Sequence, residues 1–328
     1  MRKEKVIIIL GQTATGKSAL AVKIALRLSS RQAKKAGING AEVISADSRQ
    51  VYKGLDIGTG KIPRDKKISK RYKLKDISYL HKGIPHHLLD VANPKNKFTV
   101  AEYQKLAISA IVEIIKRGKI PIICGGTGFY IDAITKGTVF PEVSPNQKLR
   151  KFLYSKSAIA LFEYLKKLDS KRAKDIKNKN EQNNKVRLIR AIEIARILGR
   201  VPKIAEVIPP HEFIKIGLCL PPEKLKKKIE KRLIKRINIG MVEEAKKLHQ
   251  KGLTWRKMNE LGLEYRYTAL YLQKKINKKE MIKKLSCEIY KYAKRQMTWF
   301  KRDKKIKWFD ASDKNLGENI LSILRKDF

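Results

Sequence analysis

Cysteines, aromatic residues and acidic residues are all scarce in this chain of 328 residues. Its three cysteines, Cys124, Cys219 and Cys287, lie far apart and form no C-x-x-C pair. This argues against a disulfide scaffold and a zinc site and favours a reducing compartment, so we expect a cytoplasmic protein. No apolar run reaches the ~18 residues of a membrane span. The first ten residues lead straight into an expected strand, which does not fit a signal peptide.

The shortage of acidic residues makes the chain strongly basic. Lysine and arginine number 76, and aspartate and glutamate number 31, which gives a formal net charge of +45 at pH 7. A field of this sign attracts polyanions and suggests a nucleic-acid partner. Lysine, isoleucine and asparagine are all abundant, as AT-rich coding would give, so compositional drift is an alternative origin of the charge.

One short segment carries a specific ligand signal, the pattern G-x-x-x-x-G-K-[ST] of a P-loop. An apolar run at 6–10 precedes it and apolar residues at 19–22 follow it, so strand, glycine loop and helix succeed one another. Loop N–H groups and the helix dipole bind an anion, while Lys17 adds a full charge and Ser18 offers a hydroxyl to Mg²⁺. The expected phosphate-binding residues are Gly11, Gln12, Thr13, Ala14, Thr15, Gly16, Lys17 and Ser18.

Strand and helix patterns alternate over the first 140 residues. Such alternation predicts a parallel sheet covered on both faces, and hence a P-loop NTPase-like α/β core. The expected strands are 6–10, 42–46, 86–91, 120–124 and, much later, 212–220; the expected helices are 18–29, 98–117, 149–154, 161–168 and 186–198. We therefore expect a core of residues 1–143 and 207–328, with basic C-terminal helices, interrupted by an all-helical insertion of residues 144–206.

Two further polar segments directly follow expected strands. Asp47 begins one of them, and Gly125-Gly126-Thr127-Gly128 is the other. Ligands of open α/β sheets lie at the carboxyl ends of strands, so we expect Asp47 to face the phosphate loop and to hold Mg²⁺ or accept a proton. The alternatives are that Asp47 only caps a helix and that the glycine segment is only a tight turn.

Three features favour structural interpretations over functional ones. His86 and His87 point to opposite faces if they lie on a strand, and no third ligand is near. Asp90 could steady Mg²⁺, which the sequence leaves open. The basic and aromatic tail at 290–309 could stack RNA bases, but core positions on a helix face are favoured for Trp299, Phe300, Trp308 and Phe309.

Taken in order, these segments closely resemble one family, the tRNA dimethylallyltransferases, also called isopentenyl-diphosphate tRNA transferases. The resemblance covers most of the chain: 11–18, 47–61, 83–90, 117–128, 183–193, Arg232, 240–244, 262–266 and 292–300. Departures from the family pattern are Gln12, where proline is frequent, Glu181-Gln182, Lys228 in place of an arginine, and Gly262-Leu263-Glu264-Tyr265.

The resemblance implies a reaction and the residues that carry it. The loop would hold the diphosphate of dimethylallyl diphosphate, and the acceptor would be N6 of the adenosine just 3′ of the anticodon in certain tRNAs. The implied catalytic residues are Asp47 as general base, Lys17, Thr127 and Arg232, with Mg²⁺ on Ser18. The implied tRNA contacts are Asp47, Ser48, Arg49, Gln50, Thr127, Arg150, Val186, Arg187, Leu188, Ile189 and Arg190. The insertion would lie against the anticodon stem-loop, and the protein would be a monomer.

Two other functions remain open at this point. A P-loop kinase or adenine-nucleotide prenyltransferase would act on a free nucleotide and would need no basic insertion. An RNA-binding ATPase or a non-catalytic module would bind tRNA without prenyl transfer. The segment at 183–193 argues against the first function, and Asp47 at a strand end argues against the second.

Overall fold

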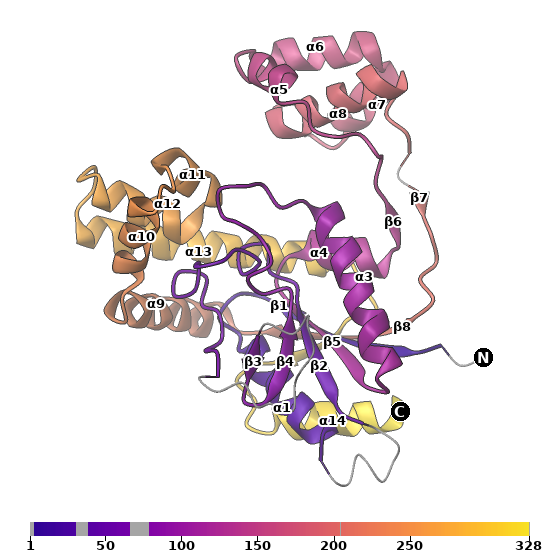
Figure 1. Cartoon of the computed structure of the whole chain (residues 1–328), viewed down its shortest axis with the longest axis vertical. Helices are drawn as coiled ribbons and strands as arrows, with labels where there is room; N and C mark the ends of the chain where they lie inside the picture. The colour runs from indigo at the N-terminus through magenta and orange to yellow at the C-terminus, as the bar shows by residue number, and fades with distance from the viewer. Residues whose placement is uncertain (1–2, 31–38, 66–78, 204, 328) are drawn as a thin grey trace. The chain divides into compact units, whose positions relative to one another are not determined.

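The computed structural model describes residues 3–30, 39–65, 79–203 and 205–327, and the chain divides into two compact units (Figure 1). Unit 1 combines Met1–Lys136 with Pro209–Phe328, and unit 2 is Gly137–Ile208. Each unit has its own hydrophobic core. Among the described residues, no helix is both long enough and apolar enough to span a membrane.

Unit 1 is built on a sheet with the strand order β3-β4-β2-β5-β1-β8-β9. All neighbours pair in parallel except β3 and β4, which form an antiparallel hairpin. The strands are β1 (Lys5–Gly11), β2 (Ala41–Ser45), β3 (Leu80–His81), β4 (Ile84–His87), β5 (Ile120–Gly125), β8 (Glu212–Cys219) and β9 (Lys307–Asp310). A mostly parallel sheet buried on both faces explains the continuous apolar runs of β1 and β5.

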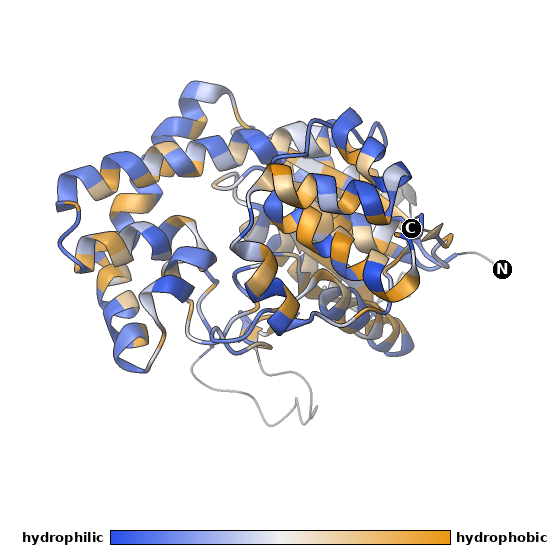
Figure 2. Ribbon diagram, turned by 90° about the horizontal axis from the view of Figure 1, so that it is seen from above, coloured by the Kyte–Doolittle hydropathy of each residue, from blue (hydrophilic) through white to orange (hydrophobic). Residues whose placement is uncertain are grey.

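Helices cover both faces of this sheet (Figure 1). Ile7 and Ile9 of β1 pack with α1 and α14 on one face, whereas Ile8 and Leu10 pack with α3 on the other. Bands of hydrophobic and hydrophilic colour alternate along the helices in Figure 2, as expected for amphipathic helices on a core. The helices of unit 1 are α1 (Lys17–Leu28), α3 (Val100–Lys116), α4 (Gly128–Thr135), α9 (Pro222–Asn238), α10 (Met241–Gln250), α11 (Trp255–Leu261), α12 (Leu263–Leu272), α13 (Lys278–Phe300) and α14 (Leu316–Asp327).

Unit 2 is a small helical bundle whose helices pack around Leu165, Leu188 and Ile192. Its first and last segments form a short antiparallel ladder in which Thr138 pairs with Glu206. The elements of unit 2 are β6 (Thr138–Val139), α5 (Gln147–Tyr154), α6 (Ala158–Leu168), α7 (Ser170–Asn178), α8 (Lys185–Leu198) and β7 (Ala205–Glu206).

The predicted α/β core with a parallel sheet is confirmed, and two local expectations are wrong. The strand expected at 86–91 is observed at Ile84–His87, because Leu88 and Asp90 adopt left-handed backbone conformations with φ of 61° and 59°. Trp308 and Phe309 lie on β9, paired with β8, and not on a helix face. Trp299 and Phe300 do pack from a helix into the core, as expected.

Candidate active site

The phosphate loop joins the end of β1 to the start of α1. Gly11 has a φ of +133°, and a Cβ there would lie 2.1 Å from the Leu218 carbonyl oxygen of β8. Gly16 precedes α1 with a φ of +92° and supplies no side chain to cap it, and the first turn of α1 has no acidic residue. The N-terminal amides of α1 are therefore open to an external anion.

Lys17 folds back over the loop that precedes it. Its ammonium group donates a hydrogen bond of 2.6 Å to the carbonyl of Gln12, and the same carbonyl accepts 2.8 Å from the Thr15 hydroxyl. Burial lowers the pKa of Lys17 to about 8; Cys124 and Asp47 act to raise this pKa, and Arg232 acts to lower it. Among the described residues no carboxylate pairs with this ammonium group, and a bound anion would stabilise its buried charge.

A cavity of about 420 Å³ opens in unit 1 beside this loop. Its charged lining residues are mostly cations: Lys17 lies at the start of α1, and α9 contributes the others. Asp47 is the one carboxylate along its described wall. The lining residues are Thr13, Ala14, Gly16, Lys17, Ser18, Ala19, Asp47, Gln50, Thr59, Gly60, Cys124, Gly125, Gly126, Lys228, Lys231, Arg232, Lys235, Tyr292 and Gln296. Such a lining suits a polyanionic ligand.

Arg232 reaches the cavity from α9 and lies against Gly60. A Cβ at Gly60 would meet the Arg232 guanidinium at 2.2 Å, so only glycine leaves room for it there. Burial lowers the pKa of Arg232, and Arg236 lowers it further. Within the described residues, no hydrogen bond or ion pair engages the Arg232 guanidinium, which leaves its fork of donors available to a ligand.

Asp47 both lines the cavity and caps a turn. Its Oδ1 accepts hydrogen bonds from the backbone N–H groups of Arg49, at 2.8 Å, and Gln50, at 3.3 Å. In the part of the chain that the structure describes, Oδ2 receives no hydrogen bond. Oδ1 thus caps the turn, as one alternative expected, and this cap leaves Oδ2 of a residue that lines the cavity unused.

Thr127 holds the Asp47 turn from the neighbouring strand end. Its hydroxyl accepts 3.0 Å from the backbone N–H of Ser48, and the Tyr292 side chain also hydrogen-bonds Thr127. Burial raises the pKa of Tyr292, and Asp47 raises it further, so the phenol is a neutral partner. Thr127 does not line the cavity itself.

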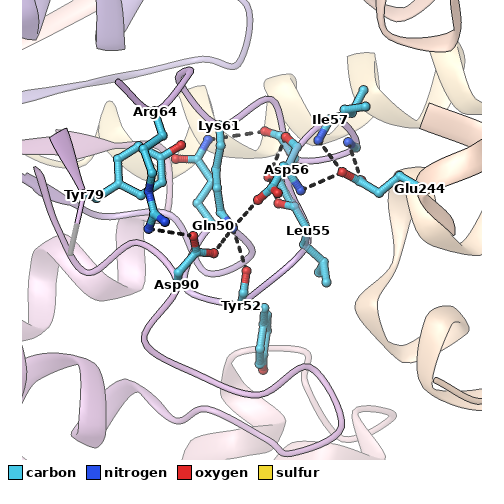
Figure 3. A network of polar contacts seen from close by, with 12 residues as sticks. Gln50, Tyr52, Leu55, Asp56, Ile57, Lys61, Arg64, Tyr79, Asp90 and Glu244 are labelled. Carbon is cyan, nitrogen blue, oxygen red and sulfur yellow. Dashed lines mark hydrogen bonds and ion pairs between the residues drawn. The ribbon is translucent and has the colours of Figure 1, made fainter. Parts of the chain in front are cut away.

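The segment after Asp47 forms a wall that is tied to the C-terminal helices (Figure 3). Glu244 of α10 accepts hydrogen bonds from the backbone N–H groups of Asp56, Ile57 and Gly58, at 2.9, 2.7 and 3.0 Å, and from the Tyr265 hydroxyl at 2.7 Å. Within the segment, the Gln50 side chain stabilises the wall by donating hydrogen bonds to the carbonyls of Thr59 and Gly60.

Lys61 anchors the other end of this wall (Figure 3). Its side chain is 1 % exposed, and its ammonium group donates to the Tyr52 carbonyl, to Asp56 and to Asp90. Asp90 also pairs with Arg64 at 3.7 Å, and it does not line the cavity. The Asp90 carboxylate is thus engaged by two cations, Lys61 and Arg64.

The two adjacent histidines make structural contacts. Burial lowers the pKa of His86 to about 4, and its Nδ1 lies 2.9 Å from the Ile84 carbonyl. His87 hydrogen-bonds the fully buried Glu42, which Arg117 and Lys119 also contact. Burial would raise the pKa of Glu42, but hydrogen bonds from His87, Lys119 and Arg117 bring it down to about 2. No group of three or more His, Cys, Asp or Glu side chains suited to a metal occurs in the described residues.

The remaining sequence-predicted contacts belong to unit 2 and differ in exposure. Arg150 donates two hydrogen bonds to the buried Glu193, at 2.7 and 2.6 Å, and Arg190 donates to the Val143 carbonyl at 2.9 Å. Leu188 and Ile189 are buried in the core of unit 2. On the same helix, Val186 is 57 % exposed, and Arg187 pairs with Glu181.

Sequence reasoning did not single out four residues of the cavity: Lys231 and Lys235 of α9, and Tyr292 and Gln296 of α13. The signal for the first two is their spacing from Lys228 and Arg232, which places these four cations within two turns of one helix. Tyr292 and Gln296 are four residues apart within the family-like segment 292–300, and therefore share a helix face.

A glycine loop on a mostly parallel sheet, with cations and one carboxylate along the described wall of the cavity, is typical of an α/β protein with a P-loop-like fold. The family model for IPP transferase matches residues 50–303. The chain therefore belongs to the IPP transferase family, the tRNA dimethylallyltransferases, and is a transferase enzyme.

Curated relatives match over nearly the full chain. A tRNA dimethylallyltransferase 2 of Treponema denticola is 38% identical over 92% of this chain and 93% of its own. A tRNA dimethylallyltransferase of Anoxybacillus flavithermus is 37% identical over 96% of this chain and 93% of its own.

Solved structures agree with the fold. The tRNA isopentenylpyrophosphate transferase of Bacillus halodurans is 33% identical, with a TM-score of 0.66, over 98% of this chain and 94% of its own. A eukaryotic dimethylallyltransferase solved acting on tRNA has a TM-score of 0.74 over 98% of this chain and 79% of its own. At 24% identity, that likeness concerns the fold alone.

Proposed function

We propose that this enzyme transfers a dimethylallyl group from dimethylallyl diphosphate to N6 of the adenosine 3′-adjacent to the anticodon in tRNA. One observation carries the proposal: a single cavity is lined by the phosphate loop, by its cations and by the Asp47 carboxylate. The leaving group and the proton of the acceptor amine thus each have a partner in the same space.

The cations of the cavity act on the leaving group. As the C–O bond of the allylic diphosphate breaks, negative charge grows on the bridging oxygen. The loop N–H groups, Lys17 and Arg232 are fixed donors, so they stabilise this charge without reorganising. The allylic cation that develops is delocalised over three carbons, which makes the allylic diphosphate a good electrophile for a weak nucleophile.

Asp47 acts on the acceptor. The N6 lone pair of adenosine is delocalised into the ring, so the amine needs to lose its proton as the C–N bond forms. Asp47 would accept that proton at Oδ2, the oxygen that the turn leaves unused in the described structure. In the overall step a C–N bond forms, and the C–O and N–H bonds break. The diphosphate leaves, and the carboxylate takes the proton.

The oxygen donors of the cavity fit Mg²⁺. The Ser18 hydroxyl lines the cavity and is oriented by a hydrogen bond with the Cys124 thiol, and the Asp47 carboxylate lines the same cavity. Mg²⁺ takes oxygen ligands, and it commonly uses one or two from the protein and completes its shell with substrate phosphates and water. Ser18 would hold the ion, and the ion would supply charge neutralisation of the diphosphate.

The basic surface supports a tRNA partner. With a formal net charge of +45, the chain should bind a polyanion through many phosphate contacts, and each contact releases counterions. We therefore propose that tRNA affinity falls steeply with salt. An affinity that stays flat from low to moderate salt would contradict this part of the proposal.

The test measures transfer of labelled dimethylallyl from its diphosphate to unmodified tRNA with Mg²⁺. We expect label at N6 of the adenosine beside the anticodon, and loss of label in Asp47→Ala with tRNA binding retained. If the wild-type enzyme ignores tRNA but prenylates or phosphorylates a free nucleotide, the proposed acceptor is wrong. Tight tRNA binding without any transfer would instead favour a binding module.

A further inference from the structure

One face of α13 lies along the cavity and contacts both the phosphate loop and the glycine turn after β5. Tyr292, Gln296 and Trp299 occupy this face, at spacings of four and three residues. Gln296 is 6 % exposed: its Oε1 accepts 2.8 Å from the backbone N–H of Thr13, and its Nε2 donates 2.8 Å to the carbonyl of Gly126. A single amide thus bridges the phosphate loop and the glycine turn after β5.

Gly126 and Gln296 are matched to each other. A Cβ at position 126 would lie 2.2 Å from Gln296 Nε2, so the amide reaches the carbonyl only because residue 126 is glycine. The bridge also needs a donor and an acceptor at the same end of one side chain. Glutamine supplies both; ionised glutamate lacks the donor, and methionine has neither.

Neighbouring residues of α13 contact the same two segments. At the phosphate loop, Gln12 Nε2 lies 3.4 Å from the Ala293 carbonyl of α13. At the glycine turn, Tyr292 hydrogen-bonds Thr127, and Trp299 packs where a Cβ at Gly128 would be 2.3 Å away. Thr127 in turn fixes the turn that carries Asp47. Gln296 bonds both segments through one side chain.

We propose that Gln296 is a positioning residue for prenyl transfer, which sets the separation between the bound diphosphate and the turn that presents Asp47. The inference rests on the function proposed above. Gln296 holds a loop N–H through its own carbonyl oxygen, so it acts on the geometry of the loop. A misplacement of about 1 Å between reacting groups costs about 100-fold in rate.

The experiment compares Gln296→Met and Gln296→Glu with the wild type in prenyl transfer to tRNA. We expect kcat to fall about 10- to 100-fold in Gln296→Met, with the KM for dimethylallyl diphosphate changed by less than about threefold. The matched control is Gln273→Met, which removes the same kind of amide from the C-terminal end of α12. Among its described contacts, the Gln273 side chain bonds only the Ala269 carbonyl. This control should keep the wild-type kcat.

Gln296→Glu supplies a readout that a space-filling role would not move. A protonated glutamic acid has the donor and acceptor of glutamine, so the ratio of its kcat to that of the wild type should rise as pH falls. The ratio removes the pH effects that the two enzymes share, and it can be measured with Gln296→Glu even if Gln296→Met does not fold.

Each outcome bears on the proposal. Near wild-type kcat in Gln296→Met, or a pH-independent ratio for Gln296→Glu, overturns the positioning role while the transfer function stands. A wild-type enzyme without transfer to tRNA overturns both. A KM increase that accounts for the whole loss in kcat/KM would make Gln296 a binding residue and would also overturn the inference.

Discussion

The Thr127 hydroxyl accepts a hydrogen bond of 3.0 Å from the backbone N–H of Ser48. Ser48 directly follows Asp47, and the Asp47 carboxylate caps the same turn at 2.8 Å through Arg49. The orientation of the carboxylate therefore depends on the strand end that carries Thr127. These two expected catalytic residues are coupled through the backbone, although Thr127 does not reach the cavity itself.

Asp47→Asn should separate the base from the cap. Asparagine retains an Oδ1 that accepts from the N–H groups of Arg49 and Gln50, but it cannot take a proton. We expect kcat for transfer to fall about 10²- to 10⁴-fold with little change in thermal stability. Asp47→Ala should lose a similar factor and, in addition, about 1 kcal/mol of stability from the missing cap. An Asp47→Asn enzyme with nearly full activity would exclude the base role.

Lys17 should make ligand affinity depend on pH. Its folded-state pKa of about 8 means that the free enzyme carries the charge below pH 8 and loses it above, whereas an anion binds the charged form. Affinity for inorganic pyrophosphate with Mg²⁺ should therefore fall as pH rises through about 8, measured by calorimetry.

Lys17→Arg is the control, because arginine stays charged throughout this range. The ratio of the wild-type Kd to the variant Kd should be constant below about pH 7 and rise by as much as about tenfold per pH unit above pH 8. A ratio that is flat over the whole range would contradict the lowered pKa. The ratio also removes the titration of pyrophosphate itself.

Glu244→Gln should loosen the cavity wall. The carboxylate serves four donors, and an amide in either orientation turns an N–H₂ group toward one pair of them. We expect faster hydrogen exchange at 56–58 and a higher KM for dimethylallyl diphosphate, since each hydrogen bond to a charged group contributes about 1.5–3 kcal/mol. Glu243→Gln, an exposed neighbour, should behave as wild type. Unchanged exchange at 56–58 would show that the wall does not need Glu244.

Arg150→Met should destabilise unit 2. Removing Arg150 leaves the fully buried Glu193 with the Asn146 N–H at 3.0 Å and Arg190 at 3.5 Å. Loss of one partner of a buried ion pair costs about 3–5 kcal/mol, to be measured in the whole protein from hydrogen exchange of α5 and α8. Lys148→Met removes an exposed charge from the same helix and should have no such effect. Wild-type protection with weakened tRNA binding would point instead to a direct contact.

The sequence predicts the elements whose signals are local. The apolar runs of β1 and β5 and the helical period of α3 are found within one or two residues of their expected positions. β9 was not predicted, because Lys307–Asp310 is short and becomes a strand only by pairing with the distant β8. Such long-range pairing has no local signature.

The same distinction applies to the candidate site. The loop and the strand ends predicted that Lys17, Ser18 and Asp47 would gather, and all three line the cavity. The roles of Glu244 and Gln296 depend on side chains that meet backbone groups 186 and 283 residues away. No local pattern of residue types predicts those contacts, since a polar residue on a helix is ordinarily predicted to face solvent.

The interior strand β1 has its final neighbour more than 200 positions later in the chain, where Lys5 pairs with Glu212. During synthesis one side of β1 stays open until β8 emerges, and all of unit 2 is made in the interval. Because Gly11 rests against Leu218, the phosphate loop gains this support only then, and its hydrogen bond with Gln296 of α13 forms later still. The enzyme thus becomes competent for its ligand late, after its helical insertion has had time to form from contacts near in sequence.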